Sequence, residues 1–216
     1  SSYQQNYQQI AMQIADCRTF NDWAEVYRKL VHWELELSSA DSNMTEMLKM
    51  QKEEANNGFA KYIAKNYLDW VAPQDNKLNN SFSKLAGQNK KSQTNNDDDR
   101  PLLSPDIFKR KVFPLIDKGE KVFLIVIDNF RLEQWRILSK EIGDMFDIEE
   151  DLYMSILPTA TQYARNAIFS GLMPKQIATM FPELWVDEDE EEGKNLNEEP
   201  LIRTQIERYR RHDKFS

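Results

Sequence analysis

The sequence predicts an α + α/β chain, in which a three-helix bundle over residues 1–72 is followed by part of an α/β domain with a parallel sheet over residues 105–216. Apolar side chains recur at helical spacing throughout the first part. In the second part, two short apolar runs each lead into a polar residue and then a helical pattern, which is typical of βα units. The intervening residues 73–104 are rich in Asn, Gln, Ser, Lys and Asp, and this composition predicts a flexible linker.

Three amphipathic helices make up the predicted bundle. The first carries apolar residues over 3–17 and the second over 23–37, with Thr19 or Asn21 as the candidate N-cap between them. A third, longer helix follows, and Pro73 is expected to end it. Because short connections favour antiparallel packing, we interpret the aromatic stripes as the bundle core rather than as a base-stacking platform.

The α/β part is expected to open with a helix that starts at Ser104-Pro105-Asp106 and ends at Gly119. The run 122–127 is too short for a helix and continuously apolar, so we predict a strand buried on both faces. A second strand is predicted at 152–157, parallel to the first after a helical crossover. Helical patterns follow each strand, and a last one precedes the basic end of the chain.

Overall composition limits the classes of function. The 36 acidic side chains exceed the 28 basic ones, for a net charge of −8, so broad electrostatic attraction to nucleic acid is not expected. No apolar run approaches the roughly 18 residues of a membrane span, and the polar start lacks the apolar core of a signal peptide. A single cysteine, Cys17, excludes an internal disulfide framework and fits a reducing compartment. We therefore expect a cytoplasmic protein.

Candidate metal-binding and nucleophilic side chains follow both predicted strands. Asp128 comes directly after the run 122–127, and Thr159 and Thr161 come just after the run 152–157. The carboxyl ends of parallel strands meet at one edge of a sheet, where helix amino ends favour anions. A carboxylate beside a hydroxyl at that edge indicates metal and phosphate chemistry, with the hydroxyl as a cation-activated nucleophile. The alternative for each of these residues is simple helix N-capping.

Two further groups are weaker candidates for binding a metal ion. His212 and Asp213 are adjacent, and adjacent helical residues point to different faces, so solvated surface is the better interpretation. The acidic run 187–192 has no regular ligand spacing and is interpreted as a solvated loop, with calcium binding as the alternative.

Longer motifs carry a family resemblance. The segments IDNFRLEQW and LPTATQYARNAIFSGLMP resemble the PglZ branch of the alkaline phosphatase superfamily, and HWELEL and QKEEAN are similar to the middle of PorX-type response regulators. The resemblance implies an effector region that controls type IX secretion in Bacteroidetes under a sensor histidine kinase. It also implies a zinc-dependent phosphodiesterase acting on oligonucleotides. The chain is then expected to be a fragment that lacks the receiver domain and the C-terminal part of the PglZ domain.

The resemblance also implies roles for individual residues. Asp128 matches the superfamily's first metal-binding aspartate, and Thr161 matches the metal-bound nucleophile, with Thr159 as the weaker choice. Arg165 and Asn166 are candidates for stabilising the equatorial phosphoryl oxygens. No later segment resembles the Asp and His motifs that complete a two-zinc site, so this fragment is expected to be inactive alone.

A signalling module without catalysis is the competing prediction. In that case the bundle transmits receiver phosphorylation and the PglZ-like half recruits partners. For the protein in general, the expected partners include type IX secretion regulators and a second copy in a homodimer. Zinc content and phosphodiester hydrolysis discriminate between the two functions.

Overall fold

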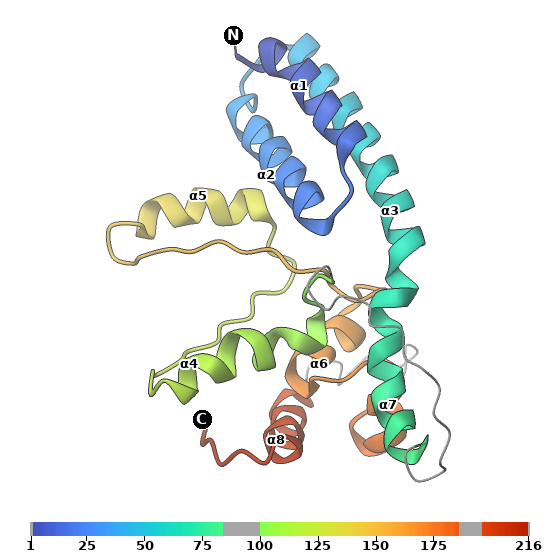
Figure 1. Ribbon diagram of the computed structural model, residues 1–216. Helices are drawn as coiled ribbons and strands as arrows, with labels where there is room; N and C mark the ends of the chain where they lie inside the picture. Colours follow the sequence, from blue (N-terminus) through green and yellow to red (C-terminus); the bar gives the residue numbers. More distant parts are fainter. Residues whose placement is uncertain (1, 84–99, 186–195, 216) are drawn as a thin grey trace. The chain divides into compact units, whose positions relative to one another are not determined.

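The computed structural model describes residues 2–83, 100–185 and 196–215, and the chain divides into two compact units. The first contains Ser1–Trp70 and Asn129–Leu152, and the second contains Pro101–Asp128 and Tyr153–Ser216. None of the described helices is both long and apolar enough to cross a bilayer. The helices, labelled as in Figure 1, are α1 (Ser2–Asp16), α2 (Phe20–Glu36), α3 (Ser42–Ser83), α4 (Phe113–Asp117), α5 (Leu132–Ile142), α6 (Thr161–Ser170), α7 (Pro174–Met180) and α8 (Glu198–Arg208), with single helical turns at Ser104–Asp106, Phe108–Val112 and Pro182–Leu184.

The three predicted helices of the N-terminal part are present and share one apolar core. Its polar centre is the fully buried pair Tyr3 and Gln51: the Tyr3 hydroxyl donates to Gln51 Oε1 at 3.1 Å, and Gln51 Nε2 donates to the Tyr7 carbonyl at 2.9 Å. Burial, with a smaller effect of Tyr7, raises the pKa of Tyr3 to about 12. The remaining core side chains come from all three helices: Ile10, Ile14, Trp23, Val26, Leu30, Leu48 and Ala55.

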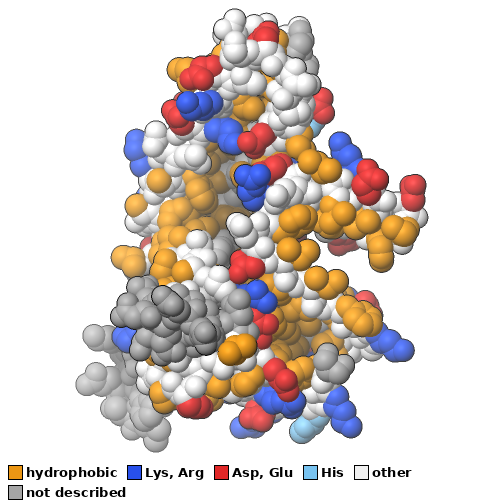
Figure 2. All heavy atoms as spheres, turned by 180° about the vertical axis from the view of Figure 1, so that it is seen from behind, with side chains coloured by type: hydrophobic (Ala, Val, Ile, Leu, Met, Phe, Trp, Pro, Cys, Tyr) orange, Lys and Arg blue, Asp and Glu red, His pale blue; other side chains and the backbone are white. Residues whose placement is uncertain are grey.

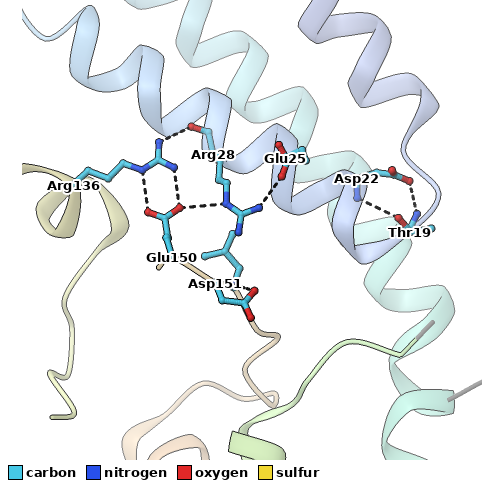
Figure 3. Close-up of polar contacts among 8 residues, drawn as sticks. Thr19, Asp22, Glu25, Arg28, Arg136, Glu150 and Asp151 are labelled. Atoms are coloured by element: carbon cyan, nitrogen blue, oxygen red, sulfur yellow. Dashed lines mark hydrogen bonds and ion pairs between the residues drawn. The ribbon is translucent and has the colours of Figure 1, made fainter. Parts of the chain in front are cut away.

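Thr19 begins α2 and closes a reciprocal capping box. Its Oγ1 accepts from the Asp22 N–H at 3.2 Å, while the Asp22 carboxylate accepts from the Thr19 N–H at 2.8 Å (Figure 3). The Asp22 carboxylate also accepts from the Arg18 N–H at 2.9 Å. These hydrogen bonds satisfy donors at the helix start and lower the pKa of Asp22 below its ordinary value. Of the two sequence candidates, Thr19 is therefore the N-cap.

Helix α3 does not end where the sequence predicted, because it continues through Pro73 to Ser83. Proline removes one hydrogen-bond donor from a helix, but its backbone φ is compatible with helical geometry. Pro73 withdraws the helical donor of the Asp69 carbonyl, four residues earlier. The neighbouring Trp70 carbonyl accepts from Arg100 Nε at 2.8 Å. Residues 84–99 of the predicted linker lie outside the described residues.

In the first unit, α5 contacts α2 through a cluster that we term the Glu150 clamp: Arg28, Arg136 and Glu150. Arg136 donates to both Glu150 oxygens, at 3.0 and 3.3 Å, and Arg28 Nε donates to Glu150 Oε1 at 3.2 Å (Figure 3). Arg136 Nη1 also donates to the Arg28 carbonyl at 3.0 Å. Hydrogen bonds from Arg136, and to a lesser extent Arg28, lower the pKa of Glu150.

In the second unit, α6 packs against α8. Apolar contacts are reinforced by Gln205, whose Nε2 donates to the carbonyls of Ile168 at 3.3 Å and Phe169 at 2.7 Å, and by Arg208, which donates to the Ser170 carbonyl. Gly171 ends α6 in a left-handed conformation, with φ of 65°. The shared apolar core consists of Phe108, Val112, Phe113, Ile168, Ile202 and Ile206.

Neither predicted strand forms a regular strand in the described part of the chain. Instead of being buried on both faces, the run 122–127 is mostly exposed, with Phe123 at 89% and Ile125 at 79% exposure, while Val122 and Val126 are partly buried. Hydrophobic side chains are visible at the molecular surface in Figure 2. A strand needs backbone hydrogen bonds from a neighbour, and this run pairs with no other described residue.

The second run, 152–157, comes closer to the prediction. Met154 forms a parallel bridge with Leu103, and its N–H donates to the Leu102 carbonyl at 2.8 Å. Met154 and Ile156 are buried whereas Tyr153 is exposed, so side chains alternate between two environments as they do along a strand. This segment leads directly towards the start of α6.

Candidate functional site

Asp128 and Thr161, 33 positions apart in the sequence, lie in direct contact within the second unit. Thr161 Oγ1 donates to Asp128 Oδ2 at 3.0 Å. The Asp128 side chain is 51% exposed and Thr161 is partly exposed, so both oxygens are close to solvent. The two residue types that the sequence predicted for phosphate chemistry are therefore adjacent.

Helix capping does not account for either residue. Helix α6 has Ala160 at its N-cap, which places Thr161 at the first helical position. Helix α5 has Arg131 at its N-cap, where the Arg131 N–H donates to Gln134 Oε1 at 2.9 Å. Asp128 instead lies at a turn in which the next residue, Asn129, has a positive φ of 55°, a conformation that asparagine tolerates better than most residues. The capping alternative is therefore not what the structure shows.

Arg165 lies one helical turn after Thr161, on the same side of α6. Its Nη1 is 3.8 Å from Asp128 Oδ2, and its Nε forms an ion pair with Glu198 Oε1 at the start of α8. The side chains of Arg165 and Glu198 are 21% and 25% exposed, which makes this pair less accessible than Asp128. Arg165 therefore lies between two carboxylates.

Asn166 and Thr159 lie in different surroundings. Asn166 is 3% exposed on the interior face of α6, and its Oδ1 has no hydrogen-bond partner among the described residues. Thr159 is exposed in the segment before α6, and Thr161 is the threonine that contacts Asp128. The structure thus brings Asp128, Thr161 and Arg165 together and places Asn166 in the core.

The weaker metal candidates do not form a ligand cluster. Asp213 is ion-paired with Arg211, whose guanidinium also donates to Asp117 at 2.6 and 3.2 Å and lies over the Phe113 ring. The acidic run 187–192 lies outside the described residues. Within the described ranges, no three His, Cys, Asp or Glu side chains are grouped so as to hold a metal ion.

Asp128 and Thr161 place two oxygen donors next to each other. Carboxylate oxygens are established zinc ligands, and metal–oxygen bonds of about 2.0–2.2 Å place two ligands of a tetrahedral ion about 3.4 Å apart. The observed 3.0 Å between Asp128 Oδ2 and Thr161 Oγ1 is a hydrogen-bond distance, so the two oxygens would have to move apart slightly to bind one zinc ion. The pair supplies two donors, and a complete site requires more.

Two family models match the chain. Residues 1–71 match the linker domain of PorX response regulators, and residues 107–215 match the BREX system PglZ alkaline phosphatase-like domain, which covers half of the chain. The chain belongs to the PglZ family. No curated protein gives a significant match. The order of the two matches is that of a PorX-type protein, and it agrees with the resemblance carried by the sequence motifs.

The PglZ match places Asp128, Thr161, Arg165 and Glu198 in one alkaline phosphatase-like domain, a class that handles phosphoesters. The sequence predicted roles for the first three of these residues and none for Glu198. An acidic residue in the first turn of a helix is common, because it interacts favourably with the helix dipole, so Glu198 carried no distinguishing signal.

Proposed function

We propose that this chain, a PorX-like effector region of a response regulator, controls type IX secretion, and that its PglZ domain is a zinc-dependent phosphodiesterase acting on oligonucleotides. The match to a response-regulator linker implies signalling partners in general. The expected partners are a sensor histidine kinase, which acts through a receiver domain, and the regulators of type IX secretion. The expected location is the cytoplasm.

The proposed domain carries a parallel sheet to which the segment 152–157 contributes a strand. The parallel bridge between Leu103 and Met154 supports such a sheet. In this arrangement Thr161 follows the carboxyl end of a strand, where open α/β sheets bind ligands, and Asp128 contacts it there.

The contact between Thr161 Oγ1 and Asp128 Oδ2, 3.0 Å long, is the observation that supports catalysis. Bound zinc would supply a Lewis acid that favours the deprotonated hydroxyl and the charge on the phosphoryl group. Asp128 and Thr161 would hold the ion between them. Arg165, on the same side of α6, is available to bind a phosphoryl oxygen.

The chain's own residues then perform a two-step transfer. The Thr161 hydroxyl, which contacts Asp128 Oδ2, releases its proton to water, and its oxygen forms a bond to phosphorus as the bond to the leaving alcohol oxygen breaks. The leaving oxygen takes up a proton from water. A water molecule then attacks the phosphothreonine, which releases the phosphate monoester and restores the hydroxyl.

Substitution at the two central residues tests the proposal in the intact protein. Thr161→Val removes the nucleophile at similar volume, so hydrolysis of a chromogenic phosphodiester should fall by about 10³-fold or more while the fold is kept. Asp128→Asn should lower zinc content as well, because a neutral amide is a poorer ligand than a carboxylate. Activity and bound zinc are measured on the same samples.

Thr159→Val is the matched control, since it makes the same chemical change two residues earlier. It should leave hydrolysis within a few-fold of the unsubstituted protein. Loss of activity in Thr159→Val with full activity in Thr161→Val would move the nucleophile to Thr159. Full activity in both valine variants and in Asp128→Asn would refute the mechanism.

A non-catalytic signalling module is the second candidate function. It is favoured by the match of residues 1–71 to a response-regulator linker, and by the lack of a three-residue ligand cluster among residues 2–83, 100–185 and 196–215. In this function the PglZ domain recruits partners, with a homodimer as one of the assemblies to be tested. Hydrolysis that depends on zinc and Thr161 would exclude it.

A further inference from the structure

Arg165 is shared between two acidic side chains of unequal distance and exposure. Its Nε is in direct ion contact with Glu198 Oε1, whereas its Nη1 stays 3.8 Å from Asp128 Oδ2. Glu198 is 25% exposed and Asp128 is 51% exposed, so the closer partner is also the more buried one. Opposite charges interact more strongly where water is partly excluded, which favours the Glu198 pair.

The position of Glu198 is set by the packing of two helices. Glu198 is the first residue of α8, and α8 is fixed to the end of α6 by Gln205 and Arg208, which donate to carbonyls of Ile168, Phe169 and Ser170. Arg165 belongs to α6 itself. The distance between Glu198 and Arg165 is therefore determined by a packed, hydrogen-bonded pair of helices.

A free guanidinium beside Asp128 would compete with a metal ion for the same carboxylate. Arg165 already forms a long ion pair with Asp128, in which 3.8 Å separates Nη1 from Oδ2, and without Glu198 the guanidinium would be drawn into a shorter pair with this carboxylate. An arginine–carboxylate pair is a strong, charge-assisted interaction, and a divalent cation would have to displace it. A partner that holds the guanidinium elsewhere removes that competition.

We propose that Glu198 is a positioning residue that retains Arg165 and so keeps Asp128 available for the metal ion. This inference rests on the proposed zinc site. In this proposal Glu198 acts through Arg165 alone. With zinc bound, the same contact would hold the guanidinium beside a cation that would otherwise repel it.

A double-mutant cycle on zinc affinity tests the inference without relying on turnover. Zinc binding is measured by competition with a chromogenic chelator for the unsubstituted protein, Glu198→Gln, Arg165→Met and the double variant. Glu198→Gln should weaken zinc binding by about tenfold, because the released guanidinium pairs with Asp128. In the Arg165→Met background, the same Glu198→Gln change should have no effect on zinc affinity.

Glu199→Gln is the matched control. It is the next residue of α8, loses the same charge, and breaks a surface pair with Arg203 that is 2.7 Å long. Its zinc affinity should equal that of the unsubstituted protein. Circular dichroism and urea unfolding of each variant identify any loss of fold.

Each outcome bears on one of the two proposals. If Glu198→Gln weakens zinc binding equally with and without Arg165, Glu198 acts through its charge alone and the positioning role is wrong. If Glu198→Gln has no effect although Asp128→Asn abolishes binding, the positioning role is wrong while the proposed zinc site stands. If zinc binding is absent or is unchanged by Asp128→Asn, the proposed zinc site itself fails, and this inference fails with it.

Discussion

At the scale of single residues, Gly171 shows how one backbone position determines the packing around the candidate site. It ends α6 with φ of 65°, a region that side chains with a Cβ rarely adopt. A Cβ at this position would also lie 2.8 Å from Gln205 Cδ. The glycine thus allows both the end of α6 and the close approach of α8, the helix that carries Glu198.

Gly171→Ala should therefore lower the free energy of unfolding by about 1–3 kcal/mol, through backbone strain and displacement of Gln205. Urea unfolding measures the effect. Gly119→Ala is the control, because Gly119 also has a positive φ, 84°, but a Cβ there would have no atom within 4 Å. It should show the strain alone and lose less stability. Equal losses in the two variants would mean that the Gln205 contact contributes nothing.

Asp128 and Thr161 were found from sequence because their signal is local: each is a polar residue that follows an apolar run and precedes a helix. Glu198 carried no such signal, because its ion pair with Arg165 depends on the packing of α8 against α6, which no local pattern encodes. For Asn166 the sequence suggested a role that its position does not favour. Adjacent residues of a helix point to different faces, and Asn166, next to Arg165, lies on the buried face of α6.

At the scale of elements, the Glu150 clamp fastens α5 to α2 in the first unit. Helix α5 itself contains no buried residue, so it has little apolar burial to hold it in place. The three charged side chains of the clamp are only 23–25% exposed, and partial burial strengthens hydrogen bonds between charged groups. The polar cluster is therefore a main attachment of this helix.

Glu150→Gln should weaken the attachment of α5 by about 1.5–3 kcal/mol, and amide hydrogen exchange of residues 132–142 should speed up accordingly. The exposed neighbour offers the control Glu149→Gln, which should leave that exchange unchanged. The pKa of Glu150 is lowered in the folded protein, so the stabilisation is present above its unfolded value of 4.5 and is lost as the pH falls through the folded value. Unchanged exchange in Glu150→Gln would show that α5 is held by other contacts.

Helices were more predictable than strands for a physical reason. The hydrogen bonds of a helix lie within one segment, so the apolar spacing of α1, α2 and α5 was enough to locate them. A strand depends on neighbours that its own residues do not specify, and the run 122–127 pairs with no described residue. Pro73 gave the wrong end for α3, because a proline inside a helix costs stability without always ending it.

At the scale of the whole molecule, Asp128 and Thr161 would supply only part of the proposed metal site. A two-metal phosphodiesterase needs ligands on both sides of the transferred group, whereas Asp128 and Thr161 lie on one. We therefore expect residues 1–216 alone to show little zinc-dependent turnover of a chromogenic phosphodiester. Assays with and without added zinc, with Thr161→Val as the background control, measure this. Efficient turnover that Thr161→Val abolishes would show that the chain holds the missing ligands.

The exposed run 122–127 has a consequence for the behaviour of the chain in concentrated solution. An extended apolar segment with unpaired backbone groups can add edge to edge with the same segment of another molecule, which is how β-aggregation starts. Solubility, rather than the free energy of unfolding, is then the property that limits how the isolated polypeptide can be purified and stored. A lysine at Phe123 would place a charge in the middle of that edge, and so raise the concentration at which the chain precipitates.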